Sequence, residues 1–327
     1  MRRREFIAGL TGATAWPCLA RAQQSRTPVV GLLSGVSFEG PYAVPVAAIR
    51  RGLEEAGFVE GRNLGFEYRS ANGRYDRLPE LAAELVRSQA TVIVAIGAST
   101  HSFAAKVASG TVPIVFAMGA DAAEVGVVKG PDAPEAAVAR TGSGTAGLAS
   151  KRLELLLELG RRGPVVGYLD NSRLSETFES NVADVTAVAR LKGRELVVFD
   201  AATESEVETA FTRMALARVR ALVVSPDPFL MTRQEQIIAR AAEILVPTIY
   251  AARGAVVLGG LMSYGVLNND MYRRAGIYAG RILMGAMPAE SPVLPPRFEL
   301  VVNSRTARSL RIAVPRQLMI RADEIID

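Results

Sequence analysis

Near its middle the chain carries the stretch Val138-Ala-Arg-Thr-Gly-Ser-Gly-Thr-Ala-Gly-Leu-Ala-Ser-Lys-Arg-Leu-Glu-Leu-Leu-Leu-Glu-Leu-Gly160. The first half of this stretch is too rich in Gly, Ser and Thr for the interior of a helix or strand. The second half has apolar or long side chains at helical spacing, at Leu148, Arg152, Leu155, Leu156 and Leu159. We therefore expect a flexible crossover, or hinge, that leads directly into a helix.

On both sides of this hinge, short apolar runs alternate with helical patterns. Before it, strands are expected at residues 28 to 34, 64 to 69, 91 to 96 and 113 to 117, and helices at 42 to 56, 78 to 89 and 102 to 108. After it, strands are expected at 164 to 169, 195 to 199, 221 to 224 and 246 to 250, and helices at 175 to 191, 204 to 217 and 233 to 245. A last strand at 256 to 264, a helix at 270 to 284 and a strand at 297 to 302 are expected to return across the hinge.

This repeated order predicts an α/β protein with two Rossmann-like lobes joined by a hinge. We expect lobe 1 to hold residues 28 to 140 and about 256 to 288, and lobe 2 to hold residues 145 to 252 and about 296 to 327. The chain is long enough for two domains of about 150 residues each. A cleft between two such lobes is a natural place for a ligand.

The first 22 residues have the features of an export signal. A cluster of arginines at residues 2 to 4 precedes an apolar run from Ile7 to Leu19, and Ala20-Arg21-Ala22 is a cleavage pattern. The Arg3-Arg4 pair fits the twin-arginine type of signal, which exports folded protein. We therefore expect a periplasmic protein that is cleaved after Ala22.

Two alternatives for this segment are weaker. The apolar run is shorter than the ~20 residues that a membrane anchor needs. A lipid anchor on Cys18, the only cysteine, would follow small and aliphatic residues, whereas Trp16-Pro17 precede it. Cleavage after Ala22 would leave no thiol for a disulfide, a nucleophile or a metal site.

The charge of the chain does not indicate nucleic-acid binding. Removal of the signal takes away four arginines and one glutamate, so the net charge falls from +5 to +2. The remaining basic residues are scattered, and the pairs Arg161-Arg162 and Arg273-Arg274 fall at or within predicted helices, where solvated faces are expected.

Ligands of open parallel sheets bind beyond the carboxyl ends of the strands, where helix N-termini offer free N–H groups. The residues at these ends that suit a ligand are Ser34, Phe38, Ser99, Thr100, Met118, Asn171, Asp227 and Tyr250. Hydroxyl groups can hold a carboxylate, Asp227 can hold an ammonium group, and aromatic side chains can flank a ring. The set suits an amino acid.

Several of these residues, and Phe229 close to Asp227, also have a structural explanation. Ser99 and Thr100 can cap a helix, Asp227 between two prolines can form a turn, and the aromatic side chains of Phe38, Phe229 and Tyr250 can belong to the core.

Catalytic patterns are weak. His101 is the only histidine, and no hydrolase triad or metal-ligand spacing surrounds it, so we expect neither an enzyme nor a metal. Residues Gly142 to Gly147 do match the G-x-G-x-x-G pattern of dinucleotide-binding proteins, with Asp170 at the end of the next strand. An exported NAD(P)-binding oxidoreductase therefore stays as an alternative, although the motif lies where the hinge is expected.

Several segments form a recognisable set: residues 52 to 69 (GLEEAGFVEGRNLGFEYR), Pro113 to Phe116, the Leu148 to Leu159 helix with Lys151 to Glu154, Met262 to Gly265, Phe298 to Asn303, Pro315 and Arg321 to Ile326. Together they resemble the periplasmic substrate-binding components of ABC transporters, of the type that includes tryptophan-binding proteins. Their order and spacing cover nearly the whole mature chain.

The resemblance implies a type I binding-protein fold that closes on its ligand and docks on a membrane permease, with no reaction and no cofactor. It also implies that Ser99 and Thr100 hold the ligand carboxylate and that Asp227 is the polar contact in lobe 2. The chain departs from the family at Ala120-Asp121-Ala122, where Asp-Pro is usual, and in the Ala- and Pro-rich residues 129 to 141. We thus expect a monomeric receptor for an amino acid or an aromatic carboxylate, and a ligand sensor for a signalling partner is a second alternative.

Overall fold

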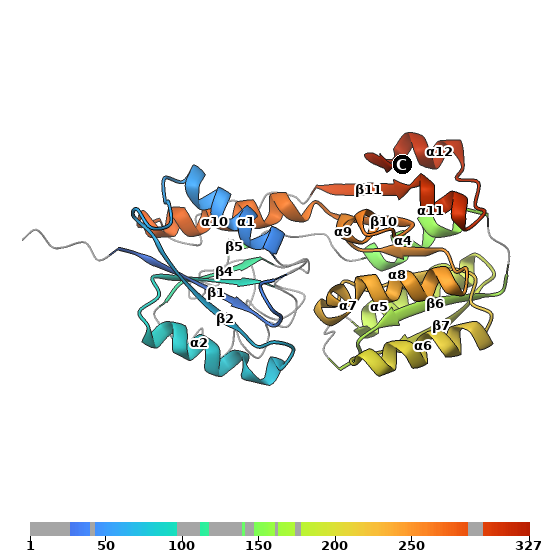
Figure 1. Cartoon of the computed structure of the whole chain (residues 1–327), viewed down its shortest axis with the longest axis horizontal. Helices are drawn as coiled ribbons and strands as arrows, with labels where there is room; N and C mark the ends of the chain where they lie inside the picture. Colours follow the sequence, from blue (N-terminus) through green and yellow to red (C-terminus); the bar gives the residue numbers. More distant parts are fainter. Residues whose placement is uncertain are drawn as a thin grey trace, which may run out of the picture.

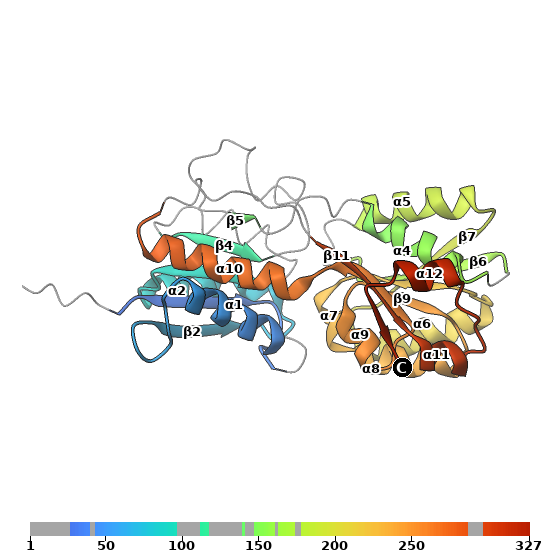
Figure 2. The same ribbon diagram turned by 90° about the horizontal axis from the view of Figure 1, so that it is seen from above.

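The computed structural model of the 327-residue chain describes residues 27–39, 43–96, 112–117, 139–140, 147–160, 163–173, 178–286 and 297–327. These residues form two lobes, each built around a mainly parallel sheet with helices packed against it (Figure 1 and Figure 2). The expected α/β class with two lobes is confirmed.

The first lobe has a five-stranded parallel sheet in the order β2-β1-β3-β4-β5. Its strands are β1 (Val29–Ser34), β2 (Gly65–Ser70), β3 (Val92–Ile96), β4 (Ile114–Ala117) and β5 (Ala139–Arg140). The helices α1 (Ala43–Glu55) and α10 (Asn268–Leu283) lie on one face, and α2 (Leu78–Arg87), which follows the 3-10 turn η2 (Tyr75–Arg77), lies on the other (Figure 1). The central strands are almost fully buried, as their continuous apolar runs predict.

The second lobe has a seven-stranded sheet in the order β12-β11-β10-β9-β8-β6-β7, in which only the β10–β11 pair is antiparallel. Its strands are β6 (Val165–Asp170), β7 (Glu195–Asp200), β8 (Leu222–Val224), β9 (Thr248–Tyr250), β10 (Met262–Val266), β11 (Phe298–Asn303) and β12 (Glu324–Ile326). Its helices are α4 (Leu148–Leu157), α5 (Phe178–Leu191), α6 (Glu204–Leu216), α7 (Pro228–Thr232), α8 (Gln234–Glu243), α9 (Arg253–Val257), α11 (Ser304–Ser309) and α12 (Arg316–Arg321).

The two faces of this sheet have separate apolar cores. Tyr168 of β6 is buried with residues of α4 and α5, whereas its neighbour Leu169 is buried with residues of α6 and α8. Successive side chains of a strand point to opposite faces, so one strand contributes to both cores. The residue that follows, Asp170, therefore lies on the same face as Tyr168.

A close contact between glycines attaches α10 to the first lobe. A Cβ on Gly276 would lie 2.1 Å from the carbonyl oxygen of Ile49, and one on Gly52 would lie 1.9 Å from that of Arg273. The backbones of α1 and α10 approach this closely only because neither position carries a side chain. This contact explains why a helix near the end of the chain packs in the first lobe.

Helix α10 and the strands around it define where the chain passes between the lobes. The chain leaves lobe 1 after β5, returns from β10 into α10, and leaves again from α10 towards β11. Only Leu267 separates β10 from α10, and its N–H donates to the carbonyl oxygen of Arg297, 2.7 Å away, just before β11. The second and third crossovers therefore lie side by side.

Two predictions around residue 256 are wrong. The run 256 to 264 was expected to be one strand, but Val256 belongs to α9, and β10 starts only at Met262. The turn at Gly259, with φ of +106°, ends the helix between them. Because β10 pairs with β9, residues 256 to 266 belong to lobe 2 and not to lobe 1 as expected.

Other expectations concern segments outside the described residues. These are the export signal, the predicted helix 102 to 108, Ala120 to Ala122, most of the glycine motif, and the predicted ligand residues Ser99, Thr100 and Met118. Among the helices that are described, none has both the length and the apolar character needed to cross a membrane.

Candidate functional site

The topology directs the carboxyl ends of both parallel sheets towards the boundary between the lobes. Strand β5 runs into the crossover to lobe 2, and β10 runs into the crossover to lobe 1. The strands parallel to each of them end at the same edge (Figure 1). This edge is where ligands of open α/β sheets bind.

In lobe 1 the two described candidates have local roles. Ser34 ends β1 with 1% exposure, and its Oγ accepts a hydrogen bond from the backbone N–H of Val36 at 3.2 Å. Phe38 is partly buried, and its ring packs edge-on against Tyr68 with 5.3 Å between the centroids. Phe38 thus places an aromatic side chain in the loop that follows β1.

In lobe 2 four polar side chains meet at the ends of β6 and β8, and we call them the polar cluster: Asp170, Asn171, Ser225 and Asp227. All are at most 6% exposed. Asp170 Oδ1 accepts from Ser225 Oγ at 2.6 Å and from the backbone N–H of Asn171 at 2.8 Å. Asn171 Nδ2 in turn donates to Asp227 Oδ2 at 3.5 Å. The predicted residues Asn171 and Asp227 are therefore brought together.

Asp227 also begins helix α7. Its Oδ1 accepts from the backbone N–H of Leu230 at 3.0 Å, which is the usual role of an aspartate at an N-cap. Pro228 follows at the first helical position, where its missing N–H costs nothing. Asp227 is thus a turn residue, as its structural explanation predicts, but the N-cap hydrogen bond uses only one of its two carboxylate oxygens.

The polar cluster has more hydrogen-bond acceptors than donors. Asp170 Oδ2 and Asn171 Oδ1 are buried without a hydrogen-bond partner in the described part of the chain. A buried acceptor without a donor is costly, so such atoms mark either a strained site or one that a ligand completes. Both unpaired atoms of these side chains are acceptors, which suits a ligand that donates. The unpaired hydroxyl of Tyr168 lies near enough to Asp170 to lower its pKa, but it makes no hydrogen bond of normal geometry with it.

The electrostatics of the polar cluster agree with this composition. Burial, together with a smaller effect of the nearby Asp170, raises the pKa of Asp227 to about 6. Burial also raises the pKa of Asp170, against the interactions with Ser225, Asn171 and the Tyr168 hydroxyl that lower it. The two carboxyl groups are therefore poorly stabilised as anions, and a cation placed between them would relieve both.

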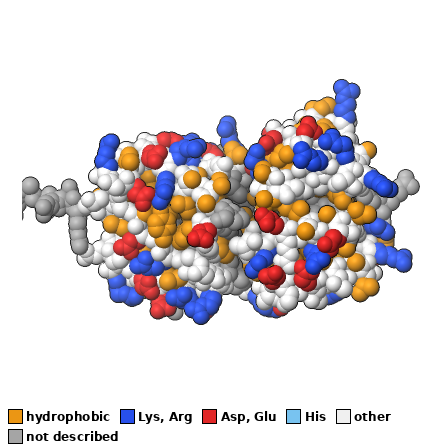
Figure 3. All heavy atoms as spheres, in the orientation of Figure 1, with side chains coloured by type: hydrophobic (Ala, Val, Ile, Leu, Met, Phe, Trp, Pro, Cys, Tyr) orange, Lys and Arg blue, Asp and Glu red, His pale blue; other side chains and the backbone are white. Residues whose placement is uncertain are grey.

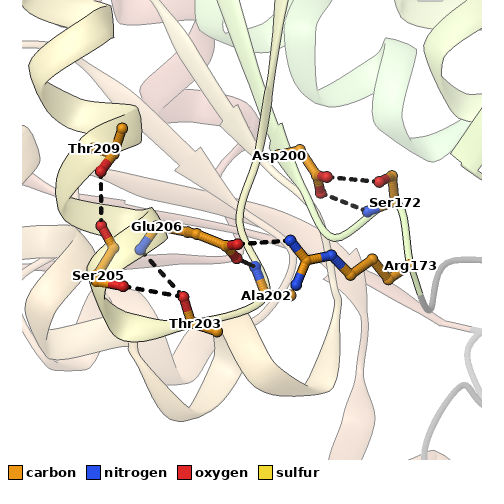
Figure 4. A network of polar contacts seen from close by, with 8 residues as sticks. All are labelled: Ser172, Arg173, Asp200, Ala202, Thr203, Ser205, Glu206 and Thr209. Carbon is orange, nitrogen blue, oxygen red and sulfur yellow. Dashed lines mark hydrogen bonds and ion pairs between the residues drawn. The ribbon is translucent and has the colours of Figure 1, made fainter.

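A second network holds the loop that follows Asn171 (Figure 4). Asp200, at the end of β7, accepts from both the backbone N–H and the Oγ of Ser172, at 2.8 and 2.7 Å. Arg173 pairs with Glu206 at 2.6 Å, and Glu206 also accepts from the backbone N–H of Ala202. The loop is thereby attached to β7 and α6, which fixes the backbone next to Asn171.

Tyr250 does not join the polar cluster. It is 2% exposed in the core shared by α6 and α8, on the opposite face of the sheet from Tyr168. Its ring packs so closely on Gly260 that a Cβ there would lie 2.7 Å from the ring edge.

Asp170 and Ser225 were not among the predicted ligand residues. Both stand at predicted strand ends, so the strand-end signal could have found them. The sequence could not show that the two residues lie together, because the hydrogen bond between them joins residues that are 55 positions apart. Within the described residues, no group of three or more His, Cys, Asp or Glu side chains could hold a metal ion.

Known proteins resemble nearly the whole chain. A family model described as "ABC transporter substrate binding protein" matches residues 30–326. A tyrosine-binding protein of Clostridioides difficile strain R20291 is 25% identical over 280 residues, which cover 84% of this chain and 79% of the relative.

Two solved structures share the fold. A conserved domain protein of Vibrio cholerae has a TM-score of 0.80 at 24% identity, and an ABC domain of Streptococcus pneumoniae in complex with L-Trp has 0.79 at 22% identity. Each match covers 92% of this chain and 100% of the other.

The matched family consists of substrate-binding proteins and not of enzymes, which removes the alternative of an oxidoreductase that would use Gly142 to Gly147. Asp170, which that alternative would have placed on a ribose, instead takes part in the polar cluster. The chain belongs to the ABC transporter substrate-binding protein family and has its type I periplasmic binding-protein fold.

Proposed function

We propose that this protein is the receptor of an ABC importer, which captures an amino acid or an aromatic carboxylate between its lobes and delivers it to a membrane permease. The observation that carries this proposal is the polar cluster, which has buried acceptors without a hydrogen-bond partner at the edge of the sheet where ligands bind. A primary ammonium group has three N–H donors and a positive charge, and it matches both features.

The rest of an amino acid would be bound by lobe 1. Ser99 and Thr100 are proposed to hold the carboxylate, and Phe38 to flank an aromatic side chain. The relatives support an aromatic ligand, because one is a tyrosine-binding protein and another was solved with L-Trp. A ligand that contacts both lobes would favour a closed arrangement of them.

The setting of the receptor is part of the same proposal. Export by the N-terminal signal would place the mature chain, from Gln23 onward, in the periplasm as a monomer. On the face shown in Figure 3, basic and acidic side chains are interspersed over both lobes. Such a mixed surface is expected of a soluble receptor, whereas a nucleic-acid-binding protein gathers its basic residues.

A ligand screen tests the function. The mature chain is heated with each of the twenty amino acids, with aromatic acids, sugars and nucleotides, and hits are measured by calorimetry. A ligand at a hundred times its Kd should stabilise the protein by ~2.7 kcal/mol, visible as a shift of several degrees. We expect shifts with tyrosine, tryptophan or a related acid, and loss of binding in Asp227→Ala.

The exposed Asp184 of α5 supplies a matched control, because Asp184→Asn also removes one carboxylate from lobe 2. It should bind like the unmodified protein. A response to nucleotides or sugars alone, or no response to any compound, would contradict the proposed ligand class.

A further inference from the structure

Only one of the two carboxylate oxygens of Asp170 accepts hydrogen bonds of normal geometry from the described residues. It is the last residue of β6 and is fully buried. Its Oδ1 accepts the two hydrogen bonds from Ser225 and Asn171, whereas its Oδ2 has no partner in the described residues. The hydroxyl of Tyr168, on the same face of β6, lies near enough to lower the pKa of Asp170 but makes no hydrogen bond of normal geometry with it.

The partners of Asp170 are also the partners of Asp227. Ser225 Oγ donates to Asp170 and accepts from the backbone N–H of Asp227 at 3.4 Å. Asn171 gives its backbone N–H to Asp170 and its side-chain Nδ2 to Asp227. Asp170 thus fixes the two groups that orient Asp227, without itself donating or accepting a bond with Asp227.

The titratable groups that act on Asp170 or on its neighbours lie on β6, β7, α4 and the turn after β8. Asp200 of β7 raises the pKa of Asp170, and Asp170 in turn raises that of Asp227. On the helix side, the hydroxyl of Tyr168 lowers the pKa of Asp170. The cation Arg152 of α4 lies near Tyr168, and its Nε donates to the carbonyl oxygen of Tyr264 in β10, 2.7 Å away. No basic group is among the main influences on Asp170 or Asp227.

Two buried carboxyl groups that share hydrogen-bond partners titrate as a pair and retain a proton more readily than either would alone. An ammonium group placed against them reverses this preference, because it favours the doubly ionised state. The proton must then leave as the ligand enters.

We propose that Asp170 is a positioning residue for the ligand's ammonium group, which holds Asn171 and Ser225 against Asp227 and couples ligand capture to the release of a proton. This inference rests on the proposed function, since it assumes a ligand with an ammonium group. It assigns to Asp170 a role that neither its place at a strand end nor the match to the family requires.

Isothermal titration calorimetry with L-tryptophan and L-tyrosine tests the coupling. The mature protein is titrated at pH 6.0 in phosphate and in imidazole, whose ionisation enthalpies differ, and the difference in heat gives the protons released. A carboxyl with a pKa of about 6 is half protonated at that pH, so we expect about 0.5 proton released per ligand and about 0.1 at pH 7.0. The Kd should be about tenfold weaker at pH 5.0 than at pH 7.0.

Asp170→Asn removes the charge of Asp170 and leaves its packing and hydrogen bonds in place, because the amide keeps an oxygen for the bonds from Ser225 and Asn171. We expect a smaller release of protons at pH 6.0, a flatter dependence of Kd on pH, and affinity at pH 7.5 weaker by about tenfold. A role in packing alone would change the affinity equally at every pH. Asp184→Asn should keep both the affinity and the proton count.

Three outcomes would overturn the inference. Ligand binding by the unmodified protein without proton release at pH 6.0 would exclude the coupling, and this test needs no variant to fold. An unchanged pH profile in Asp170→Asn would exclude the role of Asp170. If the unmodified protein binds none of the amino acids, this inference fails, and the proposed function fails with it unless an aromatic acid binds.

Discussion

Replacing Asp227 by Asn should make the empty protein more stable at neutral pH, although it should weaken ligand binding. The folded state holds the pKa of Asp227 at about 6, whereas an unfolded chain has the ordinary value near 3.8. Because folding raises this pKa, the folded state binds more protons than the unfolded state between about pH 3.8 and about pH 6. The ionised Asp227 carboxylate therefore lowers the free energy of unfolding, by its full amount above pH 6 and not at all below about pH 4.

The magnitude follows from the difference between the two pKa values. At 1.36 kcal/mol per pKa unit, the cost of the ionised carboxylate above pH 6 is on the order of 3 kcal/mol. An asparagine should recover most of this amount, because it keeps an oxygen for the N–H of Leu230 and is an equally good N-cap. Rotation of the Asn171 amide would present its unpaired Oδ1 to the new NH2 group.

Urea unfolding of the empty protein between pH 4 and pH 8 measures the effect. Asp227→Asn should exceed the unmodified protein by about 2 to 3 kcal/mol at pH 7.5, and the difference should vanish towards pH 4. Asp184→Asn should show no such trend. If Asp227→Asn is no more stable than the unmodified protein at pH 7.5, or if its advantage grows at low pH, then burial does not disfavour the ionised carboxylate as argued above.

Two further changes test the packing that positions the site. Gly276→Ala should destabilise the protein by about 1 to 3 kcal/mol in urea unfolding, because the added Cβ meets the Ile49 carbonyl oxygen at 2.1 Å. Gly254→Ala is its matched control, since the nearest atom to a Cβ there is 3.8 Å away, and it should be neutral or stabilising by up to ~1 kcal/mol. Arg152→Met should cost about 2 kcal/mol, because the partly buried carbonyl oxygen of Tyr264 loses a charged donor. Equal stabilities for Gly276→Ala and Gly254→Ala, or no loss in Arg152→Met, would contradict these contacts.

The sequence was sufficient for most long elements, because their apolar periods are unambiguous. The run from Val29 to Leu33 is continuously apolar, and α2 shows a strong apolar stripe that begins at Leu78. The segment around Val256 was mispredicted because a short apolar run fits a buried strand and a buried helix equally well. The five-residue helices α7 and α9 are too short to show a period at all.

The candidate site was only partly predictable for a different reason. Chain order shows which residues end a strand, and this identified Asn171 and Asp227. It does not show strand order, and only the pairing of β6 with β8 brings Asp170 beside Ser225. Nor does it show burial, which is what turns an ordinary aspartate at an N-cap into a carboxyl group with a pKa of about 6.

The separate cores of the two lobes explain how such a costly cluster can be useful. In the described residues, the apolar cluster of lobe 1 also takes in Val266 of β10 and packs against Leu148 of α4, whereas the two clusters that bury the apolar side chains of β6 lie within lobe 2. Burial of Asp170 and Asp227 thus lowers the stability of lobe 2, whose own two apolar clusters contain no residue of lobe 1. A ligand that neutralises the polar cluster recovers that lost stability only while it is bound. The recovered amount then adds to the affinity of the complex, whereas a fully satisfied cluster would have stabilised the empty protein instead.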